Sequence, residues 1–204
     1  IAGIALSFAL PSASHSGGRM QIEVQRKDAN AAGGDALVIP LTRSDAPPRA
    51  LGVLDDAIGG WLARVWSAGD FSGKTGEVLS LPVAGIASKR VVLIGLGEEK
   101  NASAESLRAA AGRAAKALAR AKAKQASLVV PALRRVKPEE AAQALAEGAL
   151  LGAYRFDKYK SDNGEDDDDH AKESPPALTL LVDDPAKAKR AWTSRLAAAG
   201  GVYL

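Results

Sequence analysis

An unbroken apolar run, Val91–Gly97, follows two basic residues and ends in glycine. An apolar run without polar alternation predicts a strand that is buried on both faces of a sheet. After the turn that begins at Gly97, Ser103 is a suitable N-cap and Glu105 a favourable first-turn residue for a helix. A strand, a glycine-bearing turn and a helix form half of a βαβ unit, so this region predicts an α/β fold.

The rest of the chain alternates between short strand-like runs and longer helical ones. Strands are predicted at Gln21–Gln25, Ala36–Leu41, Glu77–Leu81, Ser127–Val130 and Leu178–Val182. Helices are predicted at Ala50–Ala68, Ser103–Lys124, Pro138–Tyr154 and Pro185–Ala199. In the first of these helices, Gly59-Gly60 indicates either a break or a close contact with another segment.

Residues 1–19 are predicted to be a disordered leader outside the fold, because Pro11 and several serines and glycines follow a short apolar run. Two origins stay open: a clipped signal peptide, which would lack the usual charged leading region, or upstream sequence translated ahead of a natural start at Met20. We favour the second origin. The apolar run is shorter than the about 20 residues that span a bilayer, so no membrane association is expected.

The folded domain is predicted to span residues 20–160. An acidic flexible linker at 161–176 and a last strand and helix at 177–204 are expected to follow it. Residues 20–160 carry 21 Lys and Arg against 15 Asp and Glu, whereas 161–173 carry seven acids and one lysine. A basic body attracts anions, but this excess is small for a dedicated nucleic-acid-binding protein.

The residue types exclude several chemistries. The apolar share of 47% is ordinary for a globular protein that buries a core. The chain has no cysteine, which excludes disulfides and thiolate chemistry. Its two histidines, His15 and His170, lie in the leader and the acidic linker, where no packed residue can orient them. A Ser-His-Asp arrangement is therefore not expected.

Three stretches, in this order and spacing, carry a resemblance to one family. They are Ser67–Glu77 (SAGDFSGKTGE), Arg90–Gly97 (RVVLIGLG) and Ala146–Lys160 (AEGALLGAYRFDKYK). Together they resemble the N-terminal domain of the leucyl aminopeptidases, the cytosol aminopeptidase family of two-metal exopeptidases. The third stretch is the most specific, and the resemblance covers residues 20–160 and, more weakly, the rest of the chain.

The resemblance implies a macro-domain-like fold, a mixed sheet flanked by helices, which a connecting helix joins to a larger catalytic domain. It also implies a homo-hexamer, a cytoplasmic location, and contacts with the catalytic domain of the same protein and with neighbouring subunits. In the complete family member, motifs of the NTDAEGR kind hold two divalent metals, zinc or manganese. No such motif occurs in these 204 residues. No catalytic, cofactor-binding or metal residue can therefore be assigned, and the chain alone is expected to be inactive.

Two local patterns suggest ligands but have simpler interpretations. Glu165–His170 is rich in carboxylates, yet contiguous aspartates cannot converge on one ion, and a block of like charges is usually solvated. The Gly-Leu-Gly sequence at 95–97 precedes a helix as phosphate loops do. It matches neither a dinucleotide nor a Walker pattern, and Glu98 and Glu99 would repel phosphate. We therefore predict that these glycines allow a tight turn.

Basic and aromatic residues give a third pattern. Tyr154–Lys160 mixes the two types as nucleic-acid surfaces do, and the helix surface over Arg108–Lys124 is basic. A helix end that packs its aromatic side chains and solvates its charges is the simpler interpretation. Trp61, Trp66 and Trp192 are predicted to lie in the core or at contacts between domains.

The sequence thus predicts the non-catalytic assembly or regulatory domain of a leucyl-aminopeptidase-like metallo-exopeptidase, truncated before its catalytic domain. The complete form would release N-terminal amino acids from peptides. One alternative is a stand-alone DNA- or nucleotide-binding module, suggested by the basic body and by analogy of fold. Another is a gene fragment without function, suggested by the end of the chain at Gly200–Leu204.

Overall fold

The computed structural model describes residues 21–26, 28–158 and 177–188, with only the backbone of 154–158. The strands are β1 (Ile22–Arg26), β2 (Ala36–Thr42), β3 (Val78–Pro82), β4 (Arg90–Gly97), β5 (Gln125–Val129) and β6 (Ala177–Val182). The helices are α1 (Gly52–Ala57), α2 (Trp61–Ala68), α3 (Ala104–Arg120) and α4 (Pro138–Lys158), with short 3₁₀ turns η1 (Arg49–Leu51) and η2 (Glu99–Asn101). The predicted leader, the acidic linker and most of the predicted C-terminal helix lie outside the described residues.

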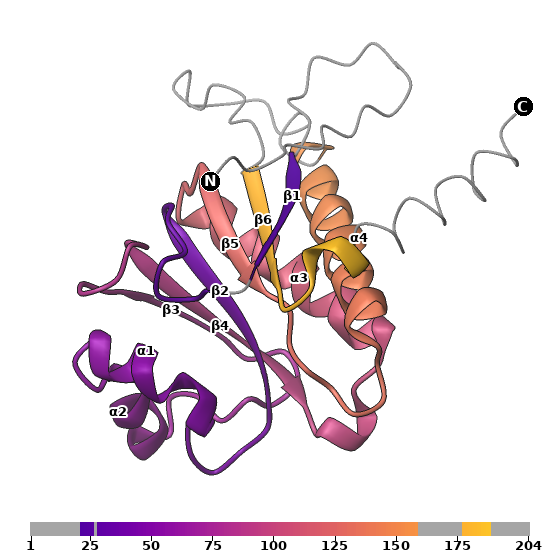
Figure 1. The fold of residues 1–204 in the computed structure, drawn as a ribbon. Helices are drawn as coiled ribbons and strands as arrows, with labels where there is room; N and C mark the ends of the chain where they lie inside the picture. Colours follow the sequence, from indigo (N-terminus) through magenta and orange to yellow (C-terminus); the bar gives the residue numbers. More distant parts are fainter. Residues whose placement is uncertain (1–20, 27, 159–176, 189–204) are drawn as a thin grey trace, which may run out of the picture.

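The strands form a six-stranded mixed sheet in the order β1-β6-β5-β2-β4-β3 (Figure 1). Neighbouring strands are parallel, except that the edge strand β3 pairs antiparallel with β4. Parallel strands need crossover connections, and α3 and α4 belong to the connections from β4 to β5 and from β5 to β6. The α/β class and the mixed sheet flanked by helices are thereby confirmed.

Helices cover both faces of the sheet (Figure 1). α3 and α4 pack on one face, where Val38 of β2 and Val92 of β4 belong to their core cluster. α1 and α2 pack on the other face, where the adjacent residues Leu37 and Leu93 belong to a second cluster. Every residue of β4 after the first is buried. The prediction of a strand buried on both faces is confirmed.

The predicted helix 50–68 is two helices, α1 and α2, separated by the Gly-Gly pair at 59–60. Both glycines have positive φ (74° and 75°), and a side chain at either would meet no described atom within 4 Å. Of the two alternatives the break is correct and the close contact is wrong. The Asp55 carboxylate accepts the amides of Leu62 (2.7 Å) and Ala63 (3.2 Å), which satisfies donors at the start of α2.

Three other boundaries differ from the predicted ones by two residues or more. α3 ends at Arg120 rather than Lys124, because Lys122 adopts a left-handed conformation (φ 51°) just after the helix. β5 consequently begins earlier than predicted, at Gln125. α4 continues past its predicted end to Lys158. None of the described helices is long and apolar enough to cross a membrane.

Asp35 joins three segments at the amino edge of the sheet. Its carboxylate accepts hydrogen bonds from Lys89 Nζ (2.9 Å) and from the amides of Lys124 (2.8 Å) and Gln125 (3.2 Å). The bond from Lys89, followed by the amide of Lys124, lowers the pKa of Asp35 to about 2. This residue therefore holds the segment before β2 against the starts of β4 and β5.

The chain after β6 turns back onto α4. Residues 185–188 are helical, and Asp184 accepts the amide of Lys187 (3.0 Å). Lys187 Nζ lies 2.6 Å from Oε1 of Glu139, in the first turn of α4, and this hydrogen bond lowers the pKa of Glu139. The described start of the predicted C-terminal helix is thus attached to the start of α4.

Candidate functional site: the carboxyl edge of the sheet and the α3–α4 surface

Open parallel sheets bind ligands beyond the carboxyl ends of their strands, so the glycines that end β4 stand where a ligand loop is expected. In this protein the loop 73–77 occupies that place. A Cβ at Gly95 would overlap the carbonyl oxygen of Lys74, and one at Gly97 would overlap Oγ1 of Thr75. The predicted tight turn is confirmed at Gly97 (φ 81°), whereas Gly95 serves the close approach of a backbone segment.

Glu77 holds this loop in place. Its carboxylate accepts the amides of Ser72 (2.9 Å) and Lys74 (3.0 Å) and the Ser72 hydroxyl (3.2 Å). Burial raises the pKa of Glu77, but these donors outweigh burial, and the pKa lies below its usual value. Much of the first stretch of the resemblance is therefore a loop that a carboxylate stabilises against β4.

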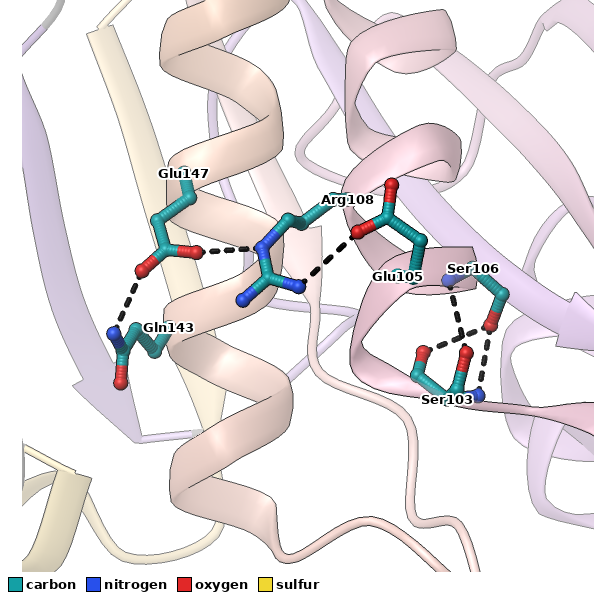
Figure 2. Close-up of polar contacts among 6 residues, drawn as sticks. All are labelled: Ser103, Glu105, Ser106, Arg108, Gln143 and Glu147. Carbon is teal, nitrogen blue, oxygen red and sulfur yellow. Dashed lines mark hydrogen bonds and ion pairs between the residues drawn. The ribbon is translucent and has the colours of Figure 1, made fainter.

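The N-terminus of α3 is closed by its own side chains (Figure 2). Ser103 Oγ accepts the amide of Ser106 (3.2 Å), and Ser106 Oγ accepts the amide of Ser103 (2.9 Å). The predicted N-cap at Ser103 is confirmed, in the form of a capping box. An anion would have to displace these contacts close to the carboxylate of Glu105, so this helix end does not favour phosphate.

Helices α3 and α4 approach each other through glycine. A Cβ at Gly148 would overlap the backbone carbonyl of Arg108, and one at Gly152 would lie 2.8 Å from the Cα of Gly112. The two backbones are therefore in near contact, which larger residues at these places would prevent. Because position 108 faces 148 and position 112 faces 152, the two helices run parallel.

Arg108 and Glu147 bridge the two helices beside this contact (Figure 2). Arg108 Nε donates to Glu147 Oε2 (2.7 Å), and Gln143 Nε2 donates to Glu147 Oε1 (2.6 Å). Arg108 Nη1 also donates to Glu105 Oε2 (3.3 Å). The hydrogen bond with Glu147 raises the pKa of Arg108. Arg108, predicted as part of a basic helix surface, is thus engaged by two carboxylates.

The tryptophans separate into core and surface. Trp66 is buried, meets Phe71 edge-on with 5.1 Å between ring centroids, and donates its Nε1 hydrogen to the Ser44 carbonyl (3.1 Å). The prediction of a core position is confirmed for Trp66. Trp61 is 41% exposed, so the prediction of a core position is wrong for this residue. The alternative, a contact between domains, stays a prediction.

Several candidates lie outside the described residues. They are His15, the acidic run 165–170 with His170, Trp192, and the side chains of Tyr154–Lys160. Within the described ranges, no group of three or more His, Cys, Asp or Glu side chains is placed to hold a metal ion.

Exposed leucines on α4 are a surface feature that the sequence analysis missed. Leu151 is 63% exposed and Leu150 is 40% exposed, and both follow the buried Ala149. The buried residues of α4 in the core cluster that includes α3 are alanines and Leu145, and neither Leu150 nor Leu151 belongs to that cluster. The Leu-Leu pair within the third stretch was the available signal. Exposed apolar side chains of this size often mark protein contacts.

The family model of the N-terminal domain of the cytosol aminopeptidase family matches residues 38–163, a range that includes all three stretches. The chain belongs to the cytosol aminopeptidase family. The probable cytosol aminopeptidase of Roseiflexus castenholzii is 34% identical over 91% of this chain and 36% of its own length. That of Protochlamydia amoebophila is 37% identical over 66% of this chain and 27% of its own length. The chain thus spans about a quarter to a third of the length of these relatives.

Solved structures confirm the fold of this aminopeptidase-family domain. A mutant of tomato leucine aminopeptidase has a TM-score of 0.68 at 23% identity, over 90% of this chain and 36% of that one. A macrodomain of Oceanobacillus iheyensis, solved with ADP, has a TM-score of 0.64 at 13% identity, over 90% of this chain and 94% of that one. The predicted macro-domain-like architecture is therefore confirmed, and identities this low concern the fold alone.

Proposed function

We propose that this chain is the non-catalytic assembly domain of a leucyl-aminopeptidase-like metallo-exopeptidase. The observation that carries the proposal is the family match over residues 38–163, in a chain much shorter than its relatives. The complete protein would release N-terminal amino acids from peptides. Two divalent metals, zinc or manganese, would supply an activated water and a polarised carbonyl there. Among the described residues, no three or more His, Cys, Asp or Glu side chains are placed to hold a metal ion, so no step of that reaction is assigned to this domain.

The packing of the described residues supports an assembly role. Residues in each of the three stretches have a structural role. Glu77 holds loop 73–77 by hydrogen bonds, and Gly95 leaves space for the backbone of that loop. Glu147 and Gly148 contact α3 from α4. Apolar side chains are exposed on both helical layers, with Leu151 on α4 and Trp61 on α2. We propose that these two surfaces contact the catalytic domain of the same protein and a neighbouring subunit of a homo-hexamer in the cytoplasm.

Peptidase assays test the proposal directly. The purified chain, supplied with zinc or manganese, is compared with a version extended through a catalytic region, using a peptide with N-terminal leucine. We expect turnover from the extended protein only. Turnover by the 204-residue chain, absent from a mock purification, would overturn the proposal.

Sedimentation of the extended protein tests the assembly role. Leu151→Ser should reduce the fraction of the largest oligomer, because it removes an exposed apolar contact. Ala132→Ser, at an exposed loop position elsewhere, is the matched control and should leave the distribution unchanged. Equal distributions for the two variants and the parent would exclude Leu151 from the interface.

DNA binding is a second candidate, with one observation in its favour. Lys116, Arg120, Lys122 and Lys124 are exposed and have no ion-pair partner among the described residues. Such cations can contact phosphates, with an affinity that falls steeply as salt rises. A gel shift with duplex DNA at low salt tests this candidate, and the absence of a shifted band would end it. Nucleotide binding lacks comparable support, because loop 73–77 fills the carboxyl edge.

A further inference from the structure

Four exposed cations gather where α3 ends and β5 begins. Lys116 and Arg120 are one helical turn apart on α3, and Lys122 and Lys124 lie in the turn that leads to β5. We refer to these four residues as the basic cluster. None of the four takes part in an ion pair within the described part of the chain. The nearby carboxylate of Asp35 is already engaged by Lys89 Nζ and by two amides.

A set of like charges without counter-charges is unfavourable at close range. The partial negative charge at the C-terminus of α3 offsets some of this repulsion, but its effect fades beyond the last turn. Lys122 and Lys124 lie past the helix end, and Lys124 donates its amide, not its ammonium group, to Asp35. The basic cluster therefore presents positive charge that the described structure does not neutralise.

The two points between which the acidic segment runs both lie near this place. α4 runs parallel to α3, with Gly152 against Gly112, and continuing this register brings the end of α4 beside the basic cluster. At the other side, the amide of Ala177 donates to the carbonyl of Lys124 (2.9 Å). Figure 1 shows the end of α4 and the starts of β5 and β6 at the same edge of the sheet, at the top of the view.

The segment between these two points is the acidic one. Residues 161–173 carry seven Asp and Glu and a single lysine, and both points from which the segment starts and returns adjoin the basic cluster. Tethering at both ends keeps the effective concentration of its carboxylates high near the cluster. An exposed ion pair contributes little alone, so several pairs and the tether must act together.

We propose that the acidic segment 161–173 docks on the basic cluster of the same chain. Its carboxylates, those of Asp166–Asp169 above all, pair with the ammonium groups of Lys116, Lys122 and Lys124 and with the guanidinium of Arg120. The sequence alone predicts a solvated linker there, because a block of like charges is usually solvated. The nearest cation of the basic cluster, Lys124, precedes the first acid of the segment, Asp162, by 38 residues. This inference is independent of the peptidase proposal.

A charge-neutralisation double-mutant cycle on the full chain tests the docking. The first variant changes Lys116, Arg120 and Lys122 to Gln, the second changes Asp166–Asp169 to Asn, and the third combines both. At low salt the Gln changes should lower the Tm by about 2–4 °C when the aspartates are present. In the Asn background the same changes should raise the Tm or leave it unaltered, because only repulsion among the cations is then removed. Both effects should shrink at about 0.5 M salt, where charges are screened within a few ångströms.

The matched control neutralises two exposed cations at the opposite edge, Lys100→Gln with Lys137→Gln. Their effect on the Tm should be the same in the aspartate and Asn backgrounds. If the Gln changes in the basic cluster alter the Tm by the same amount in the parent and in the Asn background, the docking proposal is wrong. Carbodiimide crosslinking gives a second readout: amide links from residues 161–173 to Lys122 at low salt should disappear at high salt. Links that persist unchanged at high salt would indicate mere tethering and would also overturn the proposal.

Discussion

Arg108 Nε in α3 lies 2.7 Å from Glu147 Oε2 in α4, beside the point where the backbones of the two helices touch. Both side chains are about a third exposed (35% and 36%), so water screens the pair and its contribution is modest. We expect a double-mutant cycle of Arg108→Gln and Glu147→Gln to give a coupling of about 1 kcal/mol by urea denaturation. The pair of Arg134 and Glu99, longer at 3.8 Å and more exposed (89% and 43%), is the control and should give a coupling near zero.

Substitution of Gly148, at the glycine contact between α3 and α4, should destabilise the protein more than substitution of Arg108 or Glu147. Gly148→Ala places a methyl group on the backbone of Arg108, which cannot move without shifting α3, and we expect a loss of about 2–3 kcal/mol. Gly112→Ala is the matched change on the other helix, where the new Cβ meets only the Gly148 carbonyl at 3.6 Å. Alanine favours helix over glycine, so Gly112→Ala should be neutral or stabilising by about 0.5–1 kcal/mol. Similar losses in both variants would contradict the close approach at Gly148.

Asp35 should make stability depend on pH in a defined acidic window. Its pKa in the folded chain is about 2, below the ordinary value of 3.8, so its contribution to stability is present above 3.8 and is lost as the pH falls through about 2. Asp35→Asn should therefore lower the free energy of unfolding by about 2 kcal/mol at pH 7. The difference between parent and variant should be mostly lost at about pH 2 and should vanish below it. Denaturation curves at several pH values measure this difference, and Asp56→Asn, at an exposed position, is measured alongside as the control.

Features that depend on local sequence were predictable from the sequence, and those that depend on distant partners were not. The burial of β4 follows from its own apolar run, and the N-cap at Ser103 follows from its position before the helix. The role of Gly148, in contrast, depends on Arg108, which a whole strand and turn separate from it in the chain. The resemblance marked the stretch around Gly148 as characteristic of the family, but the physical reason appears only when α3 and α4 are seen together.

The end of α3 shows a second kind of limit. Lys122 stops the helix with a left-handed backbone, and a lysine gives no sequence signal for that conformation. The helical pattern therefore predicted a longer helix, and the lysines at 122 and 124 were assigned to its surface. Their true place, in the turn beside the start of β6, is what brings them near the ends of the acidic segment.

Gly95 offers the sharpest test of how the carboxyl edge is closed. Gly95→Ala would drive a methyl group into the Lys74 carbonyl, so loop 73–77 must leave β4, at a cost of about 2 kcal/mol or more. Gly33→Ala, where no described atom lies within 4 Å of the new Cβ, should be nearly neutral. Hydrogen exchange distinguishes displacement of the loop from general weakening. The amides of Ser72 and Lys74, which Glu77 holds at 2.9 and 3.0 Å, should exchange faster in Gly95→Ala while those of β5 stay protected. If the Ser72 and Lys74 amides keep their protection, the position of loop 73–77 does not depend on the absence of a side chain at Gly95, and this explanation of how the edge is closed is wrong.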